Sequence, residues 1–194
     1  MNFCRSAFCA ALSVSSLAGP AAATDCAQWS RFSSTQEYLQ PLSVPADSIG
    51  SHLSASEWSS GVEIESEMHG DELWIDITSF PGDTTAAAGP RAIMMVGRLA
   101  DESFSQLVLS DAGTGLFAIS EQDIRSIGCQ FIWGVEGGQN PIALMREMYA
   151  AMTHYGTGQP LSTRWNGSLL GDTTNAMNVN NEIILPGWVM SAVE

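Results

Sequence analysis

Positive charge is scarce in this chain. Lysine is absent, and all seven basic residues are arginines, against 21 acidic residues among 194, which gives a formal net charge of −14. Phosphate backbones and anionic lipid headgroups are held mainly by clustered Lys and Arg, so a surface of this kind repels them. The composition therefore excludes binding to nucleic acid and peripheral binding to membranes. Two interpretations of the excess acid stay open: it keeps an exported protein in solution, or it serves a basic partner.

Long hydrophobic runs are also absent, except near the N-terminus. Residues 1–23 carry a single charge, Arg5, followed by an apolar stretch, a Gly-Pro break and three alanines. This pattern is typical of a cleaved signal peptide, and its apolar part is shorter than the roughly 20 residues that span about 30 Å of hydrocarbon. We expect residues 24–194 to form a single periplasmic or secreted domain that does not insert into the membrane after cleavage. Loss of Arg5 leaves six arginines against 21 acids, a formal charge of −15.

Cysteine is limited to two residues after the expected cleavage, Cys26 and Cys129. An exported chain with an even number of cysteines most simply pairs them, and the spacing fits neither a redox CxxC motif nor a zinc knuckle. The sequence predicts a structural Cys26–Cys129 disulfide that closes a loop of about 100 residues. The alternative is two buried free thiols.

Linear catalytic motifs are missing as well. The chain has no G-x-S-x-G or H-E-x-x-H motif and no Asp-rich loop of the EF-hand kind. Its histidines, His52, His69 and His154, have no nucleophile placed beside them by spacing. The sequence therefore favours a non-catalytic protein without a cofactor. The alternative is a small periplasmic hydrolase whose site is assembled in three dimensions and leaves no linear motif.

The chain does carry clear strand and helix patterns. Residues 24–60 are rich in Pro and Ser and predict an irregular segment with room for one helical turn. Residues 61–119 predict an antiparallel meander of about five strands: Gly61–Met68, Glu72–Ser79, Ala92–Leu99, Phe104–Ser110 and Gly115–Ile119.

Residues 120–194 change to a helical period and predict about three helices. One begins at a Ser120–Asp123 cap pair, one spans Ile142–His154, and one spans Thr173–Leu185 with Asp172 as its cap. Strands followed by helices indicate a single α+β domain whose helices pack on one face of the sheet.

One predicted hairpin has an acid at every second position. If Gly70-Asp71 forms its two-residue turn, residues of the outer face pair across the two strands as His69–Glu72, Glu67–Trp74, Glu65–Asp76 and Glu63–Thr78. On the other face the pairs are Met68–Leu73, Ser66–Ile75 and Ile64–Ile77, an apolar set that fixes the register.

Carboxylates that face each other across two strands repel, so something that neutralises them has a reason to bind there. A basic envelope or secreted protein is one candidate; Ca²⁺ held by Glu65, Asp76, Glu67 and Glu63 is a second, weaker one. The alternative is a solvated face whose charge prevents edge-to-edge pairing. The predicted binding residues are Glu63, Glu65, Glu67, His69, Glu72, Trp74 and Asp76.

Overall fold

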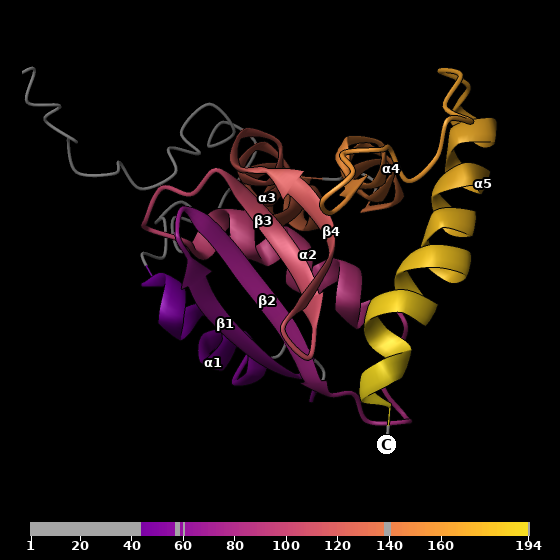
Figure 1. The fold of residues 1–194 in the computed structure, drawn as a ribbon. Helices are drawn as coiled ribbons and strands as arrows, with labels where there is room; N and C mark the ends of the chain where they lie inside the picture. The colour runs from indigo at the N-terminus through magenta and orange to yellow at the C-terminus, as the bar shows by residue number, and fades with distance from the viewer. Residues whose placement is uncertain (1–43, 57–58, 60, 138–140, 194) are drawn as a thin grey trace, which may run out of the picture.

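The computed structural model describes residues 44–56, 59, 61–137 and 141–193. Within them the chain forms an α+β fold (Figure 1). The elements in chain order are a 3-10 turn η3 (Ala46–Ser48), α1 (Ile49–Ser54), β1 (Glu63–His69), β2 (Glu72–Ser79), α2 (Ala88–Leu99), β3 (Gln106–Asp111), β4 (Thr114–Ser120), α3 (Glu121–Gly137), α4 (Pro141–Ala151), β5 (Thr153–His154), α5 (Leu169–Val179), a π-helix η4 (Asn180–Val189) and a 3-10 turn η5 (Met190–Ala192). The predicted signal peptide 1–23 and Cys26 lie outside the described residues.

The sheet is mixed, and the predicted antiparallel meander is wrong. Its strand order is β1-β2-β3-β4-β5, and β2 pairs with β3 in parallel while the other neighbours are antiparallel. Parallel neighbours need a crossover connection, and α2 provides it. The predicted strand Ala92–Leu99 is part of that helix. Eleven of its twelve residues are buried, and its apolar run from Ala92 to Val96 resembles a buried strand. Arg91 and Arg98, seven residues apart, nevertheless lie on one side of the helix.

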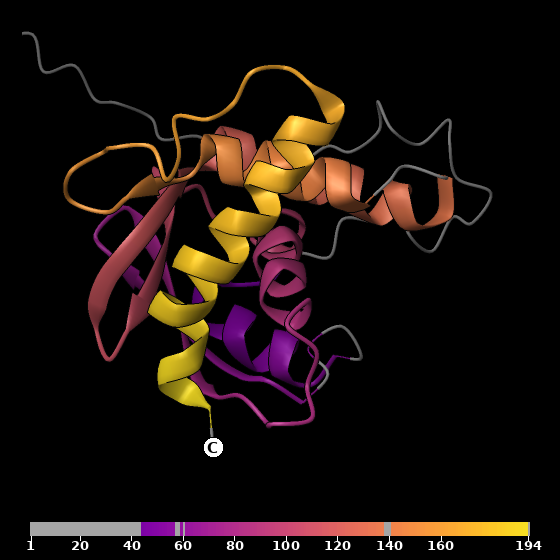
Figure 2. The ribbon, with the colours of Figure 1, turned by 90° about the vertical axis from the view of Figure 1, so that its right-hand side faces the viewer.

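One face of the sheet forms the hydrophobic core with the helices. Leu73, Ile75, Leu107 and Leu109 have no exposed surface, and they belong to a cluster that also includes residues of all five α-helices and of η4. Figures 1 and 2 show α1 and α2 on the same side of the sheet. The opposite face, toward the viewer in Figure 1, is therefore the one on which the predicted acidic residues lie.

Helices α2 and α3 touch through their backbones. A Cβ added to Gly97 would lie 1.9 Å from the carbonyl oxygen of Ile124, and one added to Gly128 would lie 2.8 Å from that of Met94. Only glycine permits this approach.

The beginning of α3 is as predicted, because the amide of Asp123 donates to the Ser120 hydroxyl at 3.1 Å. Cys129 is buried in α3, and its pairing with Cys26 stays a prediction.

The C-terminal segments differ from the expected helices. Helix α4 ends at Ala151, and His154 belongs to the short strand β5, where it pairs with Phe117. Helix α5 is capped by Ser168, which accepts a hydrogen bond from the amide of Gly171. Asp172 accepts instead from the amides of the preceding turn.

The last helix also continues beyond the expected stop at Pro186. Pro186 lies within the π-helix η4, whose residues Ile184, Trp188 and Val189 are buried in the core. Tertiary packing of these side chains outweighs the local tendency of Pro-Gly to end a helix. In the part of the chain that the structure describes, no helix has both the length and the apolar character needed to cross a bilayer.

Candidate functional site: the acidic face of the sheet

The register of the first hairpin places the predicted residues together. Glu65 pairs with Asp76, Glu67 with Trp74 and His69 with Glu72, as the alternation predicts. The apolar pairs of the other face, Ile64–Ile77, Ser66–Ile75 and Met68–Leu73, are also confirmed. One predicted pair is wrong: Glu63 faces Ser79, not Thr78, because the register shifts between Glu63 and Ile64. The shift adds a residue to one strand and leaves the rest of the ladder in place.

Arginine is confined to the helices and loops of the described chain, whereas acidic residues lie both on the strands and outside them. The five strands contain no Lys or Arg, and their acidic residues are Glu63, Glu65, Glu67, Glu72, Asp76 and Asp111. The described arginines are Arg91 and Arg98 in α2, Arg125 in α3, Arg146 in α4 and Arg164 in the loop after β5. Glu63, Glu65 and Glu67 are exposed along β1. We call the outer side of β1 and β2, from Glu63 to Asp76, the acidic face.

Trp74 is buried in the middle of this face, although the sequence suggested an exposed aromatic contact. Only 9% of it is exposed. The His69 ring stacks on the indole with centroids 4.4 Å apart, and the Tyr155 ring meets it edge-on at 5.4 Å. Val108 and Ala118 pack below them as a small second hydrophobic cluster. Trp74 therefore supports the face from within and exposes only a small part of its surface. Its role in binding stays a prediction.

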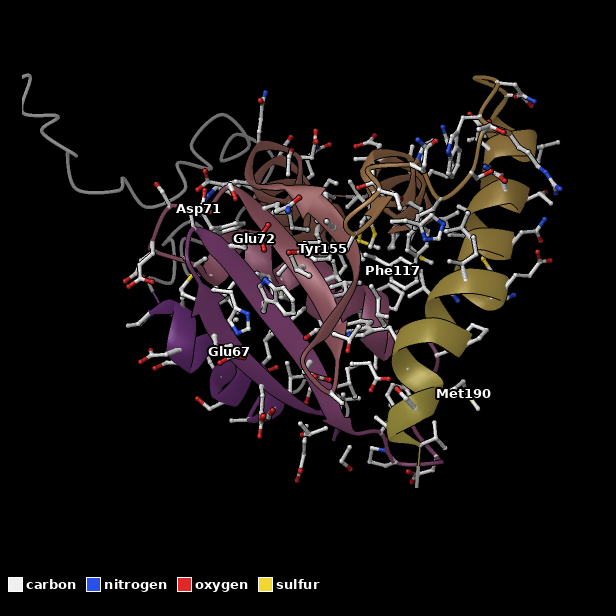
Figure 3. All side chains as sticks on the ribbon, in the orientation of Figure 1. Glu67, Asp71, Glu72, Phe117, Tyr155 and Met190 are labelled. Atoms are coloured by element: carbon white, nitrogen blue, oxygen red, sulfur yellow. The ribbon has the colours of Figure 1, made fainter. Side chains whose placement is uncertain are left out.

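Glu72 is the most highly connected carboxylate of the face. It accepts hydrogen bonds from Gln106 Nε2 at 2.6 Å, from Tyr155 Oη at 2.9 Å and from Trp74 Nε1 at 3.0 Å. Burial raises the pKa of Glu72, but these three bonds and the nearby His69 lower it by more, so the net pKa lies below its usual value. The hydrogen bond from Tyr155 Oη to Glu72 raises the pKa of Tyr155. Figure 3 shows Tyr155 and Glu72 lying close together on the sheet.

Sequence reasoning missed two partners of Glu72. Gln106 lies on β3, and Tyr155 follows β5, 34 and 83 residues from Glu72 respectively. Neither has a local signal that links it to the hairpin. Only the sheet order brings β2, β3 and the segment after β5 to the same face.

Asp76, unlike Glu72, has a pKa above its usual value. Burial raises its pKa, the Asp111 and Glu65 carboxylates raise it further, and hydrogen bonds from the amides of Gly113 and Ala112 only partly offset them. The bond from Gly113 N to Asp76 Oδ2 is 3.4 Å long. The repulsion that the sequence predicts between Glu65 and Asp76 is thus part of the environment of Asp76.

His69 is the only basic group that contacts an acid among the described residues of the acidic face. Its Nε2 lies 2.6 Å from Oε1 of Glu67, and both side chains are largely exposed. An ion pair at such an exposed site contributes little to stability. No basic side chain of the described residues forms an ion pair with Glu63, Glu65 or Asp76.

An open groove runs beside the acidic face. It encloses about 680 Å³. Its walls combine carboxylates of three strands and of η3 with hydroxyl groups, and they include Asp47, Ser51, Glu65, Glu67, Asp76, Ser110 and Asp111. Its charged lining residues are all acidic: Asp47, Glu65, Glu67, Asp76 and Asp111.

The outer edge of β1 is partly closed by α1. The amide of Ile64 donates to Ser54 Oγ at 2.8 Å, and Ser66 Oγ accepts from the amide of Gly50 at 2.8 Å while donating to the carbonyl of Ala46. The Ser54 hydroxyl satisfies an edge amide that a further strand would need, and the Ser66 hydroxyl ties the backbone of η3 and α1 to β1. The amide of Ile64 is therefore not free to pair with a further strand.

The residues suggested for Ca²⁺ do not converge. Glu63, Glu65, Glu67 and Asp76 share the acidic face, but within the described ranges no group of three or more His, Cys, Asp or Glu side chains is placed to hold a metal ion. Ca²⁺ takes six to eight oxygen ligands. The Ca²⁺ interpretation therefore stays a prediction with little geometric support.

Comparison of the chain with known protein families, with curated proteins and with solved structures finds no match.

Proposed function

We propose that this protein is an exported, non-catalytic binding or assembly-accessory protein, periplasmic or secreted, whose acidic face docks a basic partner protein. The observation that carries the proposal is that the acidic strands lack basic residues. The strands of the sheet contain six acids and no Lys or Arg, whereas the described arginines lie on helices and in a loop.

The electrostatic environment of Asp76 supports this function. Burial raises its pKa most, and the Asp111 and Glu65 carboxylates raise it further because ionised carboxylates repel each other on the free protein. A partner that presents Arg or Lys would relieve this repulsion and form new ion pairs with Glu63, Glu65 and Glu67. Complementary charge of this kind raises the association rate and the specificity for a partner more than it raises the affinity.

The Glu72 cluster gives this face its rigidity. Its hydrogen bonds hold Trp74, Gln106 and Tyr155 in one arrangement across β2, β3 and the segment after β5. The exposed glutamates of β1 therefore project from a fixed surface. A surface that is already ordered loses less side-chain entropy on binding.

The hydrolase alternative has weaker support. Ser110 lines the groove, but its hydroxyl donates to the carbonyl of Ile75 at 3.1 Å. His69 pairs with Glu67 and stacks on Trp74. Neither arrangement joins a nucleophile to a general base, which hydrolysis by a serine would need.

Affinity capture with matched variants tests the proposal. The bait proteins are the wild type, a triple variant of the acidic face (E63Q/E65Q/E67Q) and a triple variant with the same net charge (D83N/E102Q/E147Q). The second set removes exposed acids that lie outside the strands. We expect a basic envelope protein to be retained by the wild type and by the second variant and lost by the first. Equal capture by all three baits would contradict the proposal.

A further inference from the structure

A second cavity lies between the loop after β5, helix α5 and the first turn of η4. It encloses about 320 Å³, near the lower end of the range for small-molecule sites. Leu161 and Val179, both buried, form apolar parts of its wall. None of its lining residues belongs to the acidic face, so it has no part in the proposed docking of a basic partner.

A buried amide with unused hydrogen-bonding capacity lines this cavity. Asn175 is only 5% exposed, and its Oδ1 accepts a hydrogen bond from Ser162 Oγ at 2.9 Å. Its Nδ2 is buried and has no hydrogen-bond partner among the described residues. Whichever way the amide is oriented, Ser162 satisfies only one of its two ends. A buried amide group is normally fully paired, so an acceptor that enters the cavity would find a prepared partner.

The cavity also carries one positive and one negative side chain. Arg164 and Glu182 both line it, and both are exposed at its rim. No ion pair joins either of them to another described residue. Their charges are therefore available to a ligand. A guanidinium binds a carboxylate through paired hydrogen bonds, and a carboxylate accepts from an ammonium group.

From this combination we propose that the cavity is a binding site for a small zwitterion, a free amino acid. The α-carboxylate meets Arg164, the α-ammonium meets Glu182, and the amide of Asn175 supplies a further hydrogen bond at the floor. The apolar wall at Leu161 and Val179 takes a short aliphatic side chain. The volume suits a ligand of this size and leaves no room for a long peptide.

Calorimetric titration with free amino acids tests this site. The ligands are alanine, valine and leucine, each compared with its N-acetyl derivative and with its carboxamide. Glucose serves as a neutral polar compound of another class. We expect at least one free amino acid to bind. Each derivative should bind at least about ten-fold more weakly, because it loses one charge-assisted contact. Glucose should not bind.

Two exposed substitutions assign the contacts. R164Q should abolish the discrimination between the amino acid and its carboxamide, and E182Q should abolish the discrimination between the amino acid and its N-acetyl form. R91Q and E147Q, which change charges outside the cavity, should leave both ratios unchanged. Absence of binding at millimolar concentration, equal binding of glucose, or unchanged ratios in R164Q and E182Q would each overturn the proposal. Variants of the acidic face should have no effect, so this test is independent of the proposed function.

Discussion

Replacement of Glu72 by Gln removes the charge at the turn end of the acidic face while preserving side-chain size. Gln106, Trp74 and Tyr155 all donate to this carboxylate. In the variant one of the two oxygens becomes an NH₂ group, which cannot accept from the donors on its side. At least one hydrogen bond is therefore lost, and those that remain no longer involve a charged acceptor.

The expected magnitude follows from the number of bonds. A hydrogen bond to a charged group contributes roughly 1.5–3 kcal/mol, and one between neutral groups about 1 kcal/mol. Because Glu72 is partly exposed, water recovers part of this difference. We expect E72Q to lower the free energy of unfolding by roughly 1–2 kcal/mol at pH 7.

The effect of E72Q should depend on pH in a defined direction. The pKa of Glu72 in the folded protein is below its usual value of 4.5. Its stabilising contribution is therefore complete above pH 4.5 and is lost as the pH falls through the folded-state pKa. The difference between wild type and E72Q should be largest at pH 7 and should shrink below pH 4.5.

Urea denaturation followed by tryptophan fluorescence measures both effects. Unfolding curves at pH 7 and at several lower pH values give the difference in free energy at each. E147Q, an exposed glutamate on α4, provides the matched control and should change stability by less than about 0.5 kcal/mol. A neutral effect of E72Q at pH 7, or a difference that grows as the pH falls, would refute the role assigned to Glu72.

Three further predictions concern charge, packing and covalent structure. D76N should stabilise the protein by roughly a few tenths of a kcal/mol at pH 7, because the raised pKa of Asp76 means that its ionisation weakens folding. The gain should vanish below pH 3.8 in the same denaturation assay. A gain that persists below that pH would contradict the prediction. G97A should destabilise by at least about 2 kcal/mol in thermal or urea unfolding, because its Cβ would overlap the Ile124 carbonyl; a stable G97A protein would show that α2 and α3 can separate at little cost. The Cys26–Cys129 disulfide should appear as a linked peptide in non-reduced mass spectrometry, and its reduction should cost roughly 4–5 kcal/mol at most; two titratable thiols in the unfolded, unreduced protein would disprove the bond.

The hairpin could be predicted from sequence because its signals are local. Alternation with period two, a Gly-Asp turn and one largely apolar face leave a single register, from the pair Ile64–Ile77 to the pair His69–Glu72. The shift at Glu63 was not predictable, because it depends on how β1 enters the sheet. The cap of α3 was equally readable, since Ser120 and Asp123 lie three residues apart.

The crossover could not be recognised from the same kind of pattern. The apolar run from Ala92 to Val96 in α2 resembles a strand of a buried sheet, and in the prediction it outweighed the helical spacing of Arg91 and Arg98. That single error turned a mixed sheet into a meander. The Glu72 cluster was out of reach for a related reason: Gln106 and Tyr155 join it only through the strand order, which local patterns do not encode.

The binding of a basic peptide measures the function of the acidic face most directly. A fluorescent eight-residue peptide rich in Arg and Lys, with a neutral peptide of the same length as reference, is titrated with wild type, E63Q/E65Q/E67Q and D83N/E102Q/E147Q. Three exposed ion pairs at about 0.5 kcal/mol each correspond to a roughly ten-fold change in Kd. We predict this loss for the β1 variant and a change below about two-fold for the charge-matched control. Equal loss in both variants would show that net charge alone binds the peptide, and would contradict a docking site on the sheet.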